Sequence, residues 1–83
     1  MVEKKLIAKY GELHQKIKTI EELSELIQAL VKDISNQENN VIEEMADVEL
    51  MLDQLKVIYN VSQYDINLIK REKAEKALNK GSE

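Results

Sequence analysis

Proline is absent from all 83 residues of this chain, and glycine occurs only twice. These two residues interrupt or end most helices, so helices can run through almost any part of the sequence. Hydrophobic residues make up 43% of the chain, whereas aromatic residues make up only 4%. We therefore predict an all-α fold, with a protomer resembling a four-helix antiparallel bundle.

The size of the chain limits how much hydrophobic core it can bury. A chain of 83 residues forms a single domain (1–83), near the size at which one core is only marginally sufficient. Cysteine is absent, which excludes disulfides and thiolate zinc sites as a source of stability. Oligomerisation remains, and we expect the chain to assemble with further copies of itself.

The charge and hydropathy of the chain exclude two classes of partner. A formal net charge of −4 argues against nucleic acid, because binding to its backbone depends on neutralisation of phosphates by Lys and Arg. No apolar run approaches the length of a membrane span, and no signal peptide opens the sequence. We expect a cytoplasmic protein that binds neither nucleic acid nor membranes.

Apolar residues recur at steps of three and four along the chain, which predicts four helices. Their approximate ranges are 2–17, 20–36, 41–59 and 63–79. Thr19 with Glu22, and Ser62 with Asp65, have the spacing of capping boxes at the starts of the second and fourth helices. We expect Gly81 to end the fourth helix.

The second predicted helix has an apolar stripe along one side, which we expect to face the core. Its members are Ile20, Leu23, Leu26, Ile27, Leu30, Val31 and Ile34. Glu21 and Glu25 lie roughly opposite this stripe, where glutamates ordinarily form a solvated face. A functional role for them therefore requires another helix, or a partner chain, to cover that side.

The third predicted helix, which Asn60 is placed to end, is apolar around most of its circumference, so it should be buried on several sides. Glu44 and Asp47 lie at the edge of this apolar surface. An unpaired buried carboxylate must be neutralised, paired or bound to a metal ion. Lys32 is the main cation between residues 19 and 55, so a metal ion is the better explanation.

Two acidic segments, EELSE at 21–25 and EEMAD at 43–47, repeat carboxylates at helical spacing. Glu22 with Glu25, and Glu44 with Asp47, form i,i+3 pairs, each on one helix face. If the two helices are antiparallel, these carboxylates converge and repel one another unless a hard divalent cation lies between them. An all-oxygen site selects Mg²⁺ or Mn²⁺ over zinc or copper.

Magnesium held by carboxylates shares its remaining positions with substrate phosphates, so hydrolytic attack on phosphorus is the chemistry that this pattern favours. The sequence lacks cysteine, a serine with glycine on both sides and a glycine-rich phosphate loop, which excludes common nucleophile enzymes and P-loop enzymes. Basic residues in the last helix, among them Lys70 and Arg71, either complement the helix dipole or contact a phosphate.

The two acidic segments resemble the EExxE…ExxD signature of the MazG-like, all-α nucleoside triphosphate pyrophosphohydrolases. The resemblance extends through GELHQ at 11–15 and ADVELMLDQL at 46–55, which are similar to small phage or prophage-type members. It covers roughly residues 8–60. The resemblance implies hydrolysis of a nucleoside or deoxynucleoside triphosphate between its α and β phosphates, giving the monophosphate and pyrophosphate.

The resemblance also implies roles for individual residues. Those that match the family's magnesium ligands are Glu22, Glu25, Glu44 and Asp47, and Mn²⁺ is a possible substitute for Mg²⁺. Glu21 matches the first Glu of the signature, which either supports the metal ligands or serves as a base that holds or activates the attacking water. Glu21 and Glu22 make up the expected catalytic pair. Family members assemble as dimers or tetramers with sites across subunits, so the resemblance implies a homodimer or a homotetramer built as a dimer of dimers. The residues themselves offer candidate substrate contacts at Gln15, Lys70 and Arg71, and Tyr10, His14 and Gln15 are candidates for the pocket that binds the nucleobase.

Two non-enzymatic hypotheses remain open. The first is a non-catalytic helical dimerisation or interaction module whose acids form a solvated face and bind no metal. The second is an acidic adaptor or inhibitor that mimics nucleic acid. It requires a continuous exposed acidic face, which the apolar edge at Met51 and Ile58 contradicts.

Overall fold

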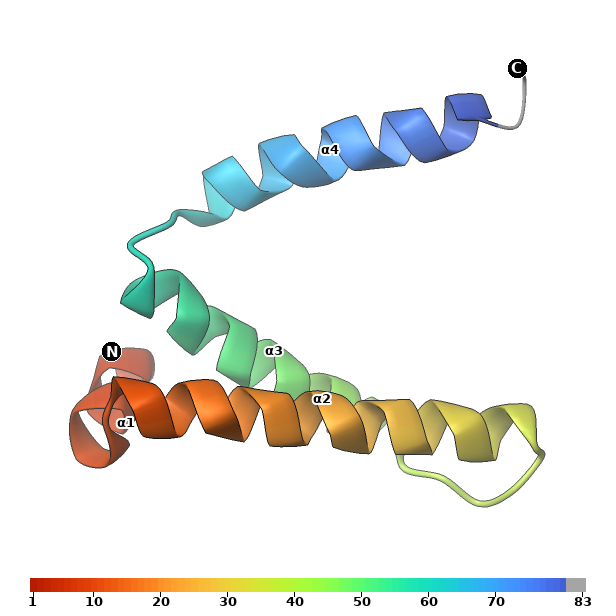
Figure 1. The fold of residues 1–83 in the computed structure, drawn as a ribbon, viewed down its shortest axis with the longest axis horizontal. Helices are drawn as coiled ribbons and strands as arrows, with labels where there is room; N and C mark the ends of the chain where they lie inside the picture. The colour runs from red at the N-terminus through yellow and green to blue at the C-terminus, as the bar shows by residue number, and fades with distance from the viewer. Residues whose placement is uncertain (81–83) are drawn as a thin grey trace.

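The structure of the chain is a computed structural model, and it describes residues 1–80. Within these residues it contains helices and no strand, which confirms the all-α prediction (Figure 1). The four helices are α1 (Val2–Tyr10), α2 (Glu12–Ile34), α3 (Val41–Ile58) and α4 (Gln63–Lys80). Gly81, which was predicted to end the last helix, lies outside the described residues.

The boundary predicted between the first two helices is wrong. The break lies at Gly11, which has φ 90° and ψ 154°, a conformation that a residue with a side chain adopts only with strain. Thr19 lies inside α2 and caps nothing, because its hydroxyl donates to the carbonyl oxygen of Gln15 at 2.8 Å. A threonine within a helix satisfies its hydroxyl on the preceding turn in this way, so a Thr-x-x-Glu pattern does not have to start a helix.

The boundaries around α3 follow from local sequence. Helices α2 and α3 are followed by Asn36 and Asn60, which have φ of 58° and 54°. In both cases the Asn amide bonds to the carbonyl three residues earlier, and the next amide bonds to the carbonyl five residues earlier. This is the Schellman motif, and it confirms the prediction for Asn60. Ser62 also acts as predicted, since its hydroxyl accepts the amide hydrogen of Asp65 at 3.1 Å.

Three of the four helices pack together, and α4 diverges from them (Figure 1). Helix α3 returns antiparallel to α2, and the short α1 folds back against both. Helix α4 has no buried residue. The molecule is accordingly flat and open, with extents of 47, 36 and 18 Å. None of the helices within residues 1–80 has the length and apolar character needed to cross a lipid bilayer.

The residues buried between the helices are mostly polar. The buried apolar residues are Ala29, Val48 and Met51. The buried polar or charged residues are Gln15, Thr19, Glu22, Glu44 and Gln54. All of them lie on α2 or α3, so the interface between these two helices is a polar layer with few apolar contacts.

The predicted orientation of α2 is wrong for the single chain. The face of α2 that packs on α3 is the polar one, whereas six of the seven residues of the apolar stripe are exposed, and Ile34 is exposed by 80%. Helical periodicity shows which side chains share a face, but not which neighbour covers that face. Here α3 covers the face that carries Gln15, which pairs with Gln54 across the interface, and most of the apolar stripe is left exposed by the part of the chain that the structure describes.

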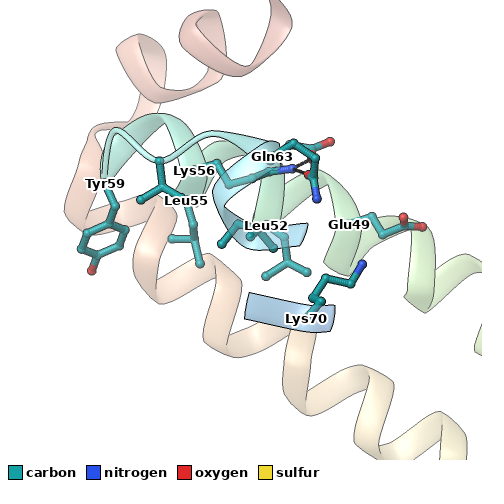
Figure 2. A pocket seen from close by; sticks show the side chains of 10 residues that line it. Glu49, Leu52, Leu55, Lys56, Tyr59, Gln63 and Lys70 are labelled. Carbon is teal, nitrogen blue, oxygen red and sulfur yellow. Dashed lines mark hydrogen bonds and ion pairs between the residues drawn. The ribbon is translucent and has the colours of Figure 1, made fainter. Parts of the chain in front are cut away.

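A pocket lies at the joint between α3 and α4, with an apolar floor that includes Leu52, Leu55 and Tyr59 (Figure 2). Lys56 crosses the joint, since its ammonium pairs with Asp53 on α3 and donates to the Gln63 side chain on α4. The contacts through Lys56 fix the start of α4 to the end of α3.

Candidate metal centre

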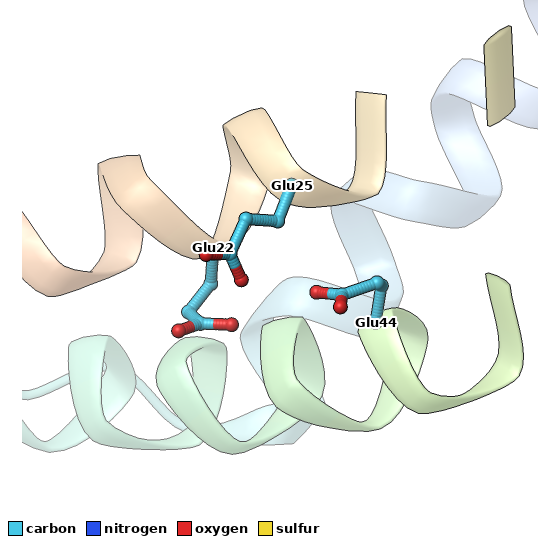
Figure 3. Close-up of side chains that lie close together, drawn as sticks. All are labelled: Glu22, Glu25 and Glu44. Atoms are coloured by element: carbon cyan, nitrogen blue, oxygen red, sulfur yellow. The ribbon is translucent and has the colours of Figure 1, made fainter. Parts of the chain in front are cut away.

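Three of the four predicted ligands meet at the α2–α3 interface. Glu22 and Glu25 on α2 and Glu44 on α3 each offer one carboxylate oxygen, and these oxygens lie within 4.8 Å of one another (Figure 3). The side chains approach from two facing helices, as the antiparallel arrangement predicts. The donor set consists of oxygen atoms alone, which suits Mg²⁺ or Mn²⁺.

Two of these carboxylates are buried with one oxygen unpaired. Glu22 is only 7% exposed and Glu44 only 8% exposed. The Oε2 atom of each is buried and has no hydrogen-bond partner, and these are the two buried side-chain N or O atoms in this state within residues 1–80. A buried charged oxygen without a partner costs several kcal/mol (about 1–3 for a neutral group). A cation at the centre of the cluster removes that cost.

The other oxygens of the same two carboxylates are paired. The Lys18 ammonium lies 3.1 Å from Glu22 Oε1 and 3.6 Å from Oε2 of the neighbouring Glu21. The Asn40 side-chain amide donates to Glu44 Oε1 at 2.7 Å. Both glutamates are therefore held from one side while the opposite oxygen stays free.

Lys18 is a site residue that the sequence prediction missed, because that prediction considers only the cations between residues 19 and 55, where Lys32 lies. The signal was present in the sequence, since Lys18 precedes Glu22 by four residues and such pairs meet on a helix. Asn40 likewise precedes Glu44 by four residues. It lies just before the first residue of α3, so helical spacing did not point to it.

The electrostatics of the cluster show an excess of negative charge. The pKa of Glu25 is raised above its ordinary value, first by the charge of Glu22, then by desolvation and the charge of Glu44. The pKa of the Lys18 ammonium is also raised, chiefly by its hydrogen bond to Glu22. Glu25 therefore holds its proton more tightly than a free carboxyl group does, and a divalent cation would compete with that proton for the Glu25 oxygens.

The fourth predicted ligand, Asp47, lies one turn beyond Glu44 on α3 and is exposed. It is not part of the group of converging oxygens among the described residues. Its position one turn before the buried Met51 places it at the edge of the face that packs against α2. Glu21, the candidate base, is also exposed, and its carboxylate pairs with Lys18 at the rim of the cluster.

Gln15, a candidate substrate contact, is buried and engaged within the protein. Its amide nitrogen donates to Gln54 Oε1 at 2.7 Å, and its oxygen accepts a hydrogen bond from His14 Nδ1 at 2.8 Å. The His14 ring stacks on Tyr10, with centroids 5.2 Å apart. These residues form a paired polar layer at the other end of the interface from the acids.

Lys70 and Arg71, the candidate phosphate contacts, are exposed on α4. Lys70 lies at the rim of the pocket between α3 and α4 (Figure 2). Because α4 does not pack against α2, one protomer does not bring these cations to the acidic cluster.

Comparisons of this chain with protein families, with curated proteins and with solved structures found no match. The functional interpretation therefore depends on the acidic signature and on the geometry of the cluster.

Proposed function

We propose that this protein is a magnesium-dependent nucleoside triphosphate pyrophosphohydrolase that cleaves NTP or dNTP between the α and β phosphates. The observation that carries the proposal is the pair of unpartnered oxygens on Glu22 and Glu44, buried beside the Glu25 carboxylate. A carboxylate cluster that served only as a solvated face would leave these oxygens in water, where they need no partner.

In this proposal, Glu22, Glu25 and Glu44 bind Mg²⁺, with Mn²⁺ as a substitute. Asp47 supplies the fourth carboxylate from the edge of α3 after a rotation of its exposed side chain. A cation bound in this way retains coordination positions for water and for the phosphates of a nucleotide.

The bound cation would neutralise triphosphate charge and polarise the attacking water. Glu21, at the rim of the cluster and held by Lys18, accepts the proton of that water. The water oxygen bonds to phosphorus while the α–β bridging P–O bond breaks. Nucleoside monophosphate and pyrophosphate are the products.

A homodimer or homotetramer is the second part of the proposal. The apolar stripe of α2 is exposed in the protomer, and Ile20, Ile27 and Ile34 are each more than half exposed. A second copy that covers this stripe would bury apolar surface at about 25 cal/mol per Å². The same assembly would give the basic face of α4, with Lys70 and Arg71, a route to the acidic cluster of a neighbouring copy.

The assembly is tested by sedimentation velocity of the wild type and of Ile27→Glu. We expect a dimer or tetramer for the wild type and a shift towards monomer for the variant. Gln28→Glu is the matched control, because it adds the same charge on the polar side of α2 and should leave the assembly unchanged. A wild-type monomer at high micromolar concentration would contradict this part of the proposal.

The exposed stripe equally favours the second candidate function, a non-catalytic helical dimerisation module. The two hypotheses differ at the cluster. A pure dimerisation module gains nothing from a divalent cation, whereas the proposed enzyme binds one with Glu22, Glu25 and Glu44.

The activity test incubates the purified protein with a panel of ribo-, deoxy- and modified nucleoside triphosphates and Mg²⁺. Ion-exchange chromatography and a pyrophosphate assay detect the two products in equal amounts. Glu44→Gln should abolish the reaction, and Glu49→Gln should not, since it removes the same charge from the same helix outside the cluster. Failure of the wild type with the whole panel would favour the dimerisation module.

A further inference from the structure

The two buried glutamates of the cluster are held by the same local device. In each case a donor four residues earlier in the chain binds Oε1, and Oε2 is left free. Lys18 does this for Glu22 at 3.1 Å, and Asn40 does it for Glu44 at 2.7 Å. The same arrangement at both helices leaves one oxygen of each glutamate free, and Figure 3 shows the carboxylates of Glu22, Glu25 and Glu44 gathered between the two helices.

We propose that Lys18 and Asn40 are positioning residues of the cation site, which hold the outer oxygen of Glu22 and of Glu44 so that the inner oxygen remains directed at the cation. This inference rests on the cation site of the proposed function. Neither Lys18 nor the donating amide of Asn40 can itself coordinate a cation, because both present N–H groups to the cluster.

The physical reason is the freedom of a glutamate side chain. Three torsions separate its carboxylate from the backbone, so a ligating oxygen without support samples many positions. A donor that fixes one carboxylate oxygen also fixes the other. The entropy cost of ordering the ligand is then incurred when the protein folds and not when the cation binds. Outer partners of this kind typically change metal affinity by about 10- to 100-fold when they are removed.

Lys18 provides a sharp test because charge and positioning predict opposite results. If Lys18 acts only as a nearby positive charge, its removal relieves repulsion and the divalent cation binds more tightly. If Lys18 positions Glu22, its removal lets the carboxylate rotate and the cation binds less tightly. The sign of the change in affinity therefore separates the two roles.

Asn40 requires a variant that does not damage the start of α3. Asn40→Ser keeps a residue favoured at the N-cap and leaves the charge unchanged, but its side chain is too short to reach Glu44. A loss of cation affinity in this variant reports the lost hydrogen bond to Glu44 Oε1.

The experiment measures Mn²⁺ binding to the full chain by the electron paramagnetic resonance signal of free Mn²⁺. We expect Asn40→Ser and Lys18→Met to bind about 10-fold or more weakly than the wild type, and Lys18→Arg to recover most of the affinity. Lys32→Met is the matched control on α2 and should bind like the wild type. Thermal melting followed by circular dichroism confirms that each variant is folded at the temperature of the titration.

Tighter or unchanged binding by Lys18→Met would overturn the role of Lys18, and unchanged binding by Asn40→Ser would overturn that of Asn40. In both cases the cation site itself would stand, because the wild type still binds. A wild type that binds no Mn²⁺ would instead overturn the proposed function and this inference with it.

Discussion

The two ends of the α2–α3 interface bury polar side chains to a similar degree, but they satisfy them differently. At one end, Gln15 and Gln54 pair with each other, and Gln54 also donates to the carbonyl oxygen of Leu50 at 3.2 Å. At the other end, Glu22 and Glu44 each keep one buried oxygen without a partner. The first end is complete within the protomer, and the second is not.

The amide end therefore needs no ligand, whereas the acidic end has room for one at its unpaired oxygens. Buried amides that satisfy one another fix the register of two helices and need nothing further. Buried carboxylates that face one another lower the stability of the fold unless a ligand neutralises them. The comparison therefore predicts opposite responses to substitution at the two ends.

The largest expected effect is at the acidic end. Glu44→Gln should weaken Mn²⁺ binding and lower the rate of triphosphate hydrolysis by about 100-fold or more, since losing a ligand exceeds the loss of an outer partner. Titration calorimetry and product analysis measure the two effects. Equal cation affinity in this variant would show that the two ends do not differ in function.

At the amide end, we expect a loss of stability instead. Gln54 is 1% exposed, and Gln54→Leu leaves the amide nitrogen of Gln15 buried without an acceptor. The free energy of unfolding should fall by about 1–3 kcal/mol. Urea denaturation measures it, and Mn²⁺ affinity under folding conditions should remain as in the wild type. A stable Gln54→Leu variant that no longer binds Mn²⁺ would show that the amide pair and the acidic cluster belong to one site.

Without divalent cations, Glu44→Gln should raise the free energy of unfolding by up to about 1 kcal/mol, because it removes a buried charge and still accepts the hydrogen bond from Asn40. Saturating Mg²⁺ should reverse the order, since at 100 times its Kd it stabilises the wild type by about 2.7 kcal/mol. Thermal melts with chelator and with Mg²⁺ provide the measurement. A variant less stable than the wild type in chelator argues that the cluster is structurally satisfied.

The smallest effect concerns pH. Because the pKa of Glu25 is raised in the folded state, the folded state binds its proton more tightly than the unfolded state does. Without cations, Glu25 therefore favours folding at low pH, and this contribution is lost as pH rises through the folded pKa. Mn²⁺ affinity should change in the opposite direction, falling as pH decreases through the same range. Thermal melts and Mn²⁺ titrations over about pH 4–7 should show both trends. Glu25→Gln should remove the contribution of Glu25 to the pH dependence of stability and of Mn²⁺ affinity.

The sequence predicted those parts of the fold that depend on local signals. Asn60 and Ser62 fix the boundary between α3 and α4 through hydrogen bonds with residues at most five positions away, and the prediction there is confirmed. The prediction of a helix start at Thr19 was wrong, because the hydroxyl of a threonine can bond either as an N-cap or to the preceding turn of a helix. The tertiary structure selects the second.

The candidate site was also predicted only in part, because the sequence gives the local spacing of residues but not the packing of the helices. The i,i+3 spacing brought Glu22 and Glu25 to one face of α2, and the antiparallel return of α3 added Glu44. The rotation of α2 about its own axis could not be predicted, because it depends on what covers the apolar stripe. Asp47 shows the same limit, since its i,i+3 spacing from Glu44 does not bring it into the group of converging oxygens among the described residues.

Gly11 has a consequence for how copies of this chain can combine. With a helical residue at this position, α1 and α2 would merge into one rod of about 50 Å. The first nine helical residues would then leave their own α3 and be free to complete the α3 of a neighbour, which is domain exchange. The backbone conformation of Gly11 thus keeps the N-terminal segment against its own α3.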